Sequence, residues 1–181
     1  MSSLKNIYTC FPGGKHKVLT MSYDDGRTED RRLVEIFNKY GIKGTFHLNS
    51  GLVRDDRVKM EEWASLYEGH EVSCHTVLHP TISRSPIEQV ALQVLEDRRK
   101  LEQAVGYPVR GMSYPNGSYT KEIVERIQQF AVSYNVNIIS GSMPIMERGK
   151  LYNISYLCHR NGSLDQYKKI HITPNEMKYY G

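Results

Sequence analysis

Short strand-like runs alternate with amphipathic helical segments along most of this 181-residue chain, and this alternation limits the folds that it can adopt. Strands separated by helices favour a parallel sheet, in which the residues that follow each strand gather at one edge. The expected strands cover residues 17–23, 44–49, 71–74, 109–114 and 132–140, and the expected helices cover residues 28–40, 60–67, 85–105 and 121–130. The pattern therefore predicts an α/β fold built around parallel strands.

Capping residues mark several of the helix boundaries. Gly41 and Gly106 follow two of the expected helices, because glycine adopts the left-handed C-cap conformation without strain. Ser85 as N-cap, Pro86 at the first helical position and Glu88 at the third form the start signal of the longest helix. These signals agree with the boundaries that the hydrophobic periodicity predicts.

Two segments rich in metal-binding groups follow two of the expected strands. The first reads Ser-Tyr-Asp-Asp-Gly over residues 22–26, and the second reads His-Thr-Val-Leu-His over residues 75–79. Either segment alone has an ordinary explanation, as a turn or as a chance His-x-x-x-His pair. Together they offer one carboxylate and two imidazoles for a divalent metal ion, with a second carboxylate as a general base. The combination is what a metal-assisted hydrolase needs.

The two adjacent acids can serve one site only under a structural condition. Neighbouring residues on a strand point to opposite faces of the sheet. Asp24 and Asp25 can therefore face the same site only if the strand ends there and the chain turns, which Gly26 allows. His47, on the expected strand 44–49, either lines the same pocket or is hydrogen-bonded within the sheet.

The two segments, in this order, resemble the polysaccharide deacetylase family, also called the NodB-homology or carbohydrate esterase family 4 domain. The family's first motif, Thr-x-Asp-Asp-Gly, is similar to residues 22–26, with Ser22 in the Thr position. Its second motif, His-(Ser/Thr)-x-x-His, is matched in full by residues 75–79. The resemblance covers about residues 15–127 of what we expect to be a single domain, and residues 128–181 are divergent.

The resemblance implies an irregular (β/α) barrel with fewer than eight regular units. Residues 141–181 are rich in Tyr, Asn, Ser and Lys and lack clear periodicity. We therefore expect a barrel that is incomplete at its C-terminal end, through divergence or truncation. A barrel without its last strands exposes a sheet edge and apolar surface, which favours self-association into a homo-oligomer.

The resemblance also implies roles for individual residues. Asp25, His75 and His79 would hold one divalent metal ion, usually zinc, although this N/O ligand set also suits cobalt, nickel or manganese. Asp24 would be the general base that takes a proton from the metal-bound water. Thr76 stands where His-Glu-x-x-His zinc proteases carry their base, so the base has to come from another part of the chain.

The later motifs of the family are matched less well. Its third motif, Arg-Pro-Pro-Tyr-Gly, corresponds to residues 113–117, where Ser113 stands in the Arg position and Arg110 lies three residues upstream. The backbone N–H of Tyr114 is the expected donor to the developing oxyanion, since that role needs no particular side chain.

The general acid is the weakest assignment. The family supplies an Asp-Trp pair and a Leu-x-His near its C-terminus, but the one tryptophan of this chain, Trp63, comes far too early. His159, in Leu157-Cys158-His159, keeps the spacing of the last motif and is a weak candidate, and His171 is weaker still. The alternative is that this chain lacks the acid.

Composition excludes several other classes of protein. The net charge of +4 is mild and unclustered, so nucleic-acid binding is not expected. No apolar run approaches the roughly 18 residues of a membrane span, and the first residues lack the apolar region of a signal peptide. Three widely spaced cysteines do not suggest a disulfide framework. These features predict a cytoplasmic protein that binds neither nucleic acid nor membrane.

The sequence therefore predicts a metal-dependent amide hydrolase that removes N-acetyl groups from an amino-sugar substrate through attack of metal-activated water. Two alternatives stay open. The same site could hydrolyse a small cytosolic amide or cyclic imide, which the expected cytoplasmic location favours. The chain could also be a catalytically inactive relative that binds carbohydrate or metal, which the poorly matched later motifs favour.

Overall fold

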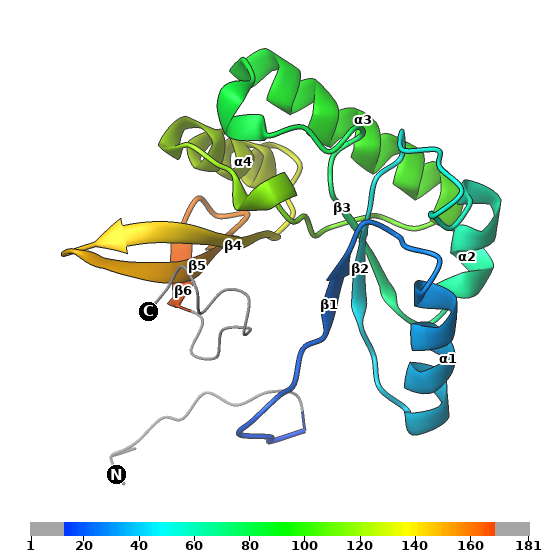
Figure 1. Cartoon of the computed structure of the whole chain (residues 1–181). Helices are drawn as coiled ribbons and strands as arrows, with labels where there is room; N and C mark the ends of the chain where they lie inside the picture. The colour runs from blue at the N-terminus through cyan, green and yellow to red at the C-terminus, as the bar shows by residue number, and fades with distance from the viewer. Residues whose placement is uncertain (1–12, 169–181) are drawn as a thin grey trace, which may run out of the picture.

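The computed structural model describes residues 13–168, and its first layer is a sheet of three parallel strands (Figure 1). The strands are β1 (Ser22–Asp24), β2 (Thr45–Leu48) and β3 (Glu71–Cys74), in the order β1-β2-β3. Asp24 lies opposite His47, and Leu48 lies opposite Cys74, so the strands end at one edge of the sheet. The expected parallel arrangement of these strands is confirmed. The strand β1 is shorter than predicted, and Val18 and Leu19, which were expected in it, are exposed.

The fourth expected strand, residues 109–114, shrinks to a single bridge. It pairs in parallel with Cys74, whose N–H donates to the carbonyl of Gly111 at 2.9 Å. A Cβ at Gly111 would stand 2.5 Å from Ser73 Oγ, so glycine is what allows this close approach to β3. Prolines near both ends of the segment cannot donate to a ladder, which limits its length. The segment nevertheless carries Ser113 to the strand ends.

Helices cover the parallel sheet. They are α1 (Asp30–Tyr40), α2 (Trp63–Leu66), α3 (Ile87–Val105) and α4 (Lys121–Ser133), with 3-10 turns η1 (Met60–Glu62), η2 (Ile82–Arg84) and η3 (Pro115–Gly117). In Figure 1, α1 and α2 lie together beside the sheet, and α3 packs on β3 and lies next to α4. Among the described helices, none has both the length and the apolar composition to cross a bilayer.

Two C-caps were predicted correctly and one N-cap was not. Gly41 and Gly106 adopt left-handed φ angles of 66° and 79° at the ends of α1 and α3. The expected N-cap Ser85 instead closes η2, where its N–H donates to the carbonyl of Ile82 at 3.1 Å. The helix α3 therefore begins at Ile87, later than the Ser-Pro signal predicts, and has no side-chain cap.

The C-terminal part of the described chain forms a second sheet. Its strands are β4 (Ile138–Glu147), β5 (Lys150–Cys158) and β6 (Leu164–Lys168), which pair antiparallel in the order β4-β5-β6. The expected strand at residues 132–140 is therefore wrong in its bounds, because its first residues still belong to α4. Figure 1 shows the second sheet on the side of the parallel sheet away from α1 and α2.

No closed barrel forms among residues 13–168, since the two sheets remain separate. The strands β5 and β6 escaped prediction because neither alternates between buried and exposed residues: every residue of β6 is exposed. Between β4 and β5, Arg148 and Gly149 have φ angles of 50° and 76°, as in a two-residue hairpin turn.

One cluster of buried apolar side chains joins the two sheets and the helices. Phe46 of β2 packs on Tyr67 with ring centroids 4.7 Å apart. The same cluster continues through Leu101 of α3 and Ile127 of α4 to Cys158 of β5. This packing holds the strand ends in place, where the candidate site lies.

Candidate metal centre

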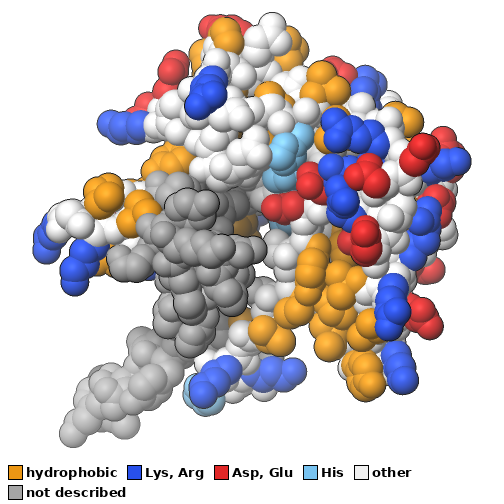
Figure 2. Space-filling model, viewed as in Figure 1, with side chains coloured by type: hydrophobic (Ala, Val, Ile, Leu, Met, Phe, Trp, Pro, Cys, Tyr) orange, Lys and Arg blue, Asp and Glu red, His pale blue; other side chains and the backbone are white. Residues whose placement is uncertain are grey.

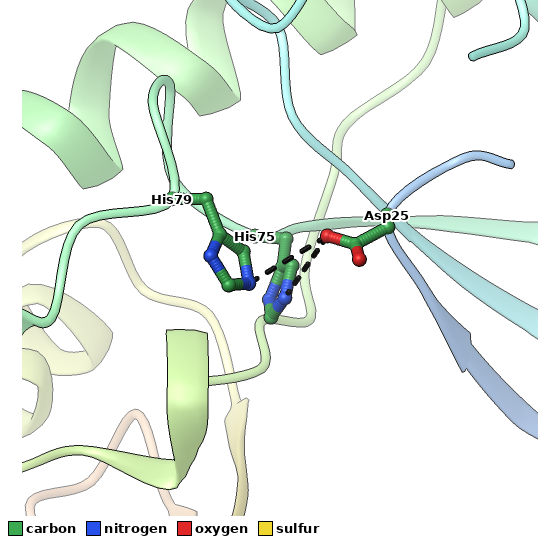
Figure 3. A group of neighbouring side chains, drawn as sticks. All are labelled: Asp25, His75 and His79. Carbon is green, nitrogen blue, oxygen red and sulfur yellow. Dashed lines mark ion pairs between the residues drawn. The ribbon is translucent and has the colours of Figure 1, made fainter. Parts of the chain in front are cut away.

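Three side chains predicted as metal ligands meet at the carboxyl edge of the parallel sheet (Figure 3). Asp25 follows β1, and His75 and His79 follow β3. Asp25 Oδ1 lies 3.8 Å from His75 Nε2 and 3.6 Å from His79 Nε2. Two ligand atoms bound to one zinc ion at a tetrahedral angle are roughly 3.4 Å apart, so the spacing suits a shared cation better than a direct hydrogen bond.

Left-handed backbone conformations direct these side chains into the site. The φ angles are 81° at Asp25, 67° at Thr76 and 54° at His79, and each is unusual for a residue other than glycine. Hydrogen bonds hold the turn after β3, since Asn49 Nδ2 donates to the carbonyls of His75 and Thr76 at 2.7 and 3.0 Å. The chain thus turns directly after Asp24, as the sequence requires for both acids to face one site.

Hydrogen bonding determines which nitrogen of His75 faces the site. The Nδ1 atom lies 3.0 Å from the carbonyl oxygen of Ser113, which can only accept a hydrogen bond, so Nδ1 carries the proton. The lone pair of Nε2 is then directed at Asp25. Burial lowers the pKa of His75 below its ordinary value, which favours the neutral imidazole that binds metals.

Asp25 Oδ1 is the atom that most clearly calls for a cation. It is buried and has no hydrogen-bond donor among the described residues, although two imidazole nitrogens lie within 4 Å. Burying a carboxylate oxygen without a partner is unfavourable, and a divalent ion between the three ligand atoms would remove that penalty. The residues present therefore fit a metal ion.

Asp24, the predicted base, lies beside this cluster. Its Oδ1 accepts a hydrogen bond from Ser113 Oγ at 2.9 Å, and its Oδ2 lies 3.9 Å from His75 Nε2. Ser113 thus contacts both the predicted base and a predicted ligand, although it stands where the family has arginine. The nearby Arg110 is exposed. The role of Ser113 could not be predicted, because a lone serine carries no signal of what its hydroxyl will reach.

Arg57 is another site residue that the sequence did not single out. Its Nη1 donates to the carbonyl oxygen of Asp25 at 2.7 Å and lies 3.3 Å from Asp25 Oδ2. The loop that carries it lies far from both motifs in the sequence, so no spacing pattern points to it.

A cavity of about 1060 Å³ opens over the cluster. Both sheets contribute to its wall, with lining residues that include Asp24, Asp25, His47, His75, His79, Ser113, Tyr114, Tyr156 and Asp165. Figure 2 shows histidine and acidic side chains side by side near the centre of one face of the molecule. The predicted oxyanion donor Tyr114 is buried at this wall.

One further histidine, His47, lines the cavity, and another, His159, pairs with a residue that does. His47 also contacts Ser22 Oγ through Nε2 at 2.8 Å, and burial lowers the pKa of His47 to about 4. His159, the weak acid candidate, pairs through Nε2 with Asp165 Oδ2 at 2.8 Å. His159 is not among the described residues that line the cavity, although Asp165 is. The weaker candidate His171 lies outside the described residues.

Comparison with known proteins gives the same family as the two motifs. The family model described as polysaccharide deacetylase matches residues 12–134, so β4, β5 and β6 lie beyond the match, as the expected divergence from residue 128 implies.

Individual relatives match shorter stretches. Peptidoglycan-N-acetylglucosamine deacetylase PgdA of Listeria monocytogenes is 24% identical over 125 residues, 67% of this chain and 26% of that protein. The probable hydrolase YhcX of Bacillus subtilis is 49% identical over 63 residues, 35% of this chain and 12% of that protein. The chain therefore spans a minor part of these relatives' lengths.

A solved structure shares the fold. The structure of BA3943, a CE4 family pseudoenzyme from Bacillus anthracis, matches with a TM-score of 0.56 and 21% identity, over 68% of this chain and 43% of that chain.

Proposed function

Because the chain belongs to the polysaccharide deacetylase family, we propose that it is a metal-dependent hydrolase that removes an N-acetyl group from an amino-sugar. The observation that carries this proposal is the buried Oδ1 of Asp25, which has no donor among the described residues and faces two imidazole nitrogens. The printed name of the Listeria relative, a peptidoglycan-N-acetylglucosamine deacetylase, supports an N-acetylated amino-sugar as the substrate class.

Asp25, His75 and His79 would hold the ion. Zinc suits one carboxylate and two imidazoles with an open position, and cobalt, nickel and manganese accept the same donors. When bound there, a divalent ion supplies a Lewis acid for the amide carbonyl and lowers the pKa of a water molecule.

The neighbouring residues would move the protons. Asp24 accepts the proton that the attacking water gives up, and Ser113 holds Asp24 Oδ1 so that Oδ2 faces the ligand cluster. The backbone N–H of Tyr114 donates to the carbonyl oxygen as negative charge develops on it. His159 is the candidate that protonates the leaving amine; its Nε2 pairs with Asp165, which leaves Nδ1 for the proton transfer.

We also propose how the substrate is enclosed. The antiparallel sheet takes the place of further barrel strands, since Tyr156 and Asp165 add a wall to the cavity that Asp24 and His75 also line. Residues 1–181 would then act as one domain with an irregular, open barrel around the cavity. A sugar ring is a suitable occupant, because polar groups and an aromatic side chain share this wall.

Acetate release from N-acetylglucosamine oligomers by zinc-loaded protein tests the proposal directly. Asp25→Ala should lose both the metal and the activity, whereas the exposed loop variant Asp55→Asn should retain both. Turnover of small amides or cyclic imides without acetate release from the oligomers would support the alternative substrate class and contradict ours.

An inactive, metal-binding relative is the second candidate. The similarity to a pseudoenzyme and the serine in the Arg position of the third motif favour it. Stoichiometric metal binding without hydrolysis of any amide in the panel would identify this case.

A further inference from the structure

We infer that Arg57 is a positioning residue of the metal centre, whose guanidinium holds Asp25 so that one carboxylate oxygen faces the two imidazoles. The inference rests on the proposed metal site, but not on the substrate that the site acts upon. Arg57 comes from the loop between β2 and η1, away from both motifs.

The two carboxylate oxygens of Asp25 contact different groups. Arg57 Nη1 lies 3.3 Å from Asp25 Oδ2, whereas Oδ1 is the oxygen nearest to the Nε2 atoms of His75 and His79. The Arg57 side chain is only 9% exposed, so water screens this contact little. Because the Arg57 guanidinium holds Oδ2, it restrains rotation of the Asp25 carboxylate away from the imidazoles.

The same nitrogen also restrains the backbone of Asp25. Arg57 Nη1 donates to the Asp25 carbonyl at 2.7 Å, and the Asp25 N–H donates to the carbonyl of His47 at 2.8 Å. Both polar groups of this left-handed residue are thereby bound. A strained conformation persists only where its surroundings determine it, and here Arg57 supplies half of that restraint.

The loop of Arg57 is itself attached to the turn that it supports. Val58 N–H donates to the carbonyl of Gly26 at 2.9 Å, and Thr28 N–H donates to the carbonyl of Asp56 at 3.1 Å. Arg57 therefore acts from a fixed platform, which a positioning residue requires.

Arg27 provides a matched control. It pairs with Arg57 in an antiparallel backbone bridge, so it occupies the same small region. Its guanidinium, however, contacts Asp56 at 2.7 Å, and its side chain is 45% exposed. Removing Arg27 deletes the same chemical group without touching Asp25.

Metal affinity, measured on folded protein, tests the inference. Zn²⁺ dissociation constants from competition with a chromophoric chelator, and the visible absorption spectrum of the Co²⁺-loaded protein, are compared for wild type, Arg57→Ala, Arg57→Lys and Arg27→Ala. We expect Arg57→Ala to bind Zn²⁺ roughly 10- to 100-fold more weakly, the range typical of groups that orient metal ligands. Arg57→Lys should fall between it and wild type, because an ammonium lacks the planar fork of donors. Arg27→Ala should match wild type.

Thermal unfolding of the metal-free proteins separates positioning from stability. Wild-type affinity and an unchanged Co²⁺ spectrum in Arg57→Ala, with lower thermal stability alone, would overturn the inference. If Arg57→Ala does not fold, Arg57→Lys decides. Absence of metal from the wild type would overturn both the inference and the proposed function. Tight metal binding that depends on Arg57, without acetate release, would uphold the inference and refute the deacetylase.

Discussion

Replacing Asp97 by asparagine should remove much of the pH dependence of this protein's stability. Asp97 is fully buried on α3 and accepts the backbone N–H groups of Ser50 at 2.8 Å and of His75 at 3.0 Å. Burial outweighs these hydrogen bonds and raises the pKa of Asp97 from 3.8 to about 6. The folded protein therefore binds this proton more tightly than the unfolded chain does.

The size and sign of the effect follow from that difference. Each pKa unit corresponds to about 1.4 kcal/mol, so ionising Asp97 should lower the free energy of unfolding by roughly 3 kcal/mol. Because the folded-state pKa is raised, protonated Asp97 stabilises the folded protein. This contribution is complete below pH 3.8 and is lost as the pH rises through about 6. Burial raises the pKa of Asp30 to about 6 as well, so the Asp97→Asn variant should keep part of the slope.

Urea unfolding of the metal-free protein at several pH values between about 4 and 7 measures this slope. Asp97→Asn should show a flatter dependence of unfolding free energy on pH than wild type. The exposed Glu88→Gln, on the same helix, is the control and should reproduce the wild-type curve. Parallel curves for Asp97→Asn and wild type would refute the reasoning, because the variant has no carboxyl group there to titrate.

Three further predictions concern the site and its support. Asp24→Asn should retain the metal but lose turnover by about 100-fold or more, measured as acetate release beside metal content; full activity would contradict its role as base. Ser113→Ala should lower kcat with little change in Zn²⁺ affinity, because the Ser113 carbonyl still binds His75, and Ser113→Thr should restore kcat in part. Gly111→Ala should destabilise the fold by about 1–3 kcal/mol in urea titrations, since the new Cβ would meet Ser73 Oγ at 2.5 Å; an unchanged midpoint would show that β3 can yield.

The predictable part of the fold is the part with a clear pattern of apolar burial. The strands β2 and β3 are short runs buried over most of their length, the helices α1 and α3 each bury one apolar face, and all four were expected within a few residues of their bounds. The residues of β5 are buried without a regular alternation, and all residues of β6 are exposed. Their sequences therefore lack the hydrophobic periodicity from which a strand is predicted. Their pairing depends on the partner strand rather than on their own composition.

The candidate metal ligands were likewise determined by sequence. Asp25, His75 and His79 follow parallel strands, and the ends of parallel strands meet at one edge, so their convergence follows from order and spacing. Local chemistry also required the turn after Asp24, because two adjacent acids cannot otherwise face one site.

The groups that orient those residues were decided by tertiary structure alone. Ser113 Oγ donates a hydrogen bond to Asp24, Asp97 accepts the backbone N–H of His75, and Arg57 pairs with Asp25. Serine, aspartate and arginine are common everywhere in proteins, and nothing in their neighbours along the chain marks these three. Their contacts arise because folding brings segments distant in sequence within about 3 Å of the site residues, the distance at which a hydrogen bond forms.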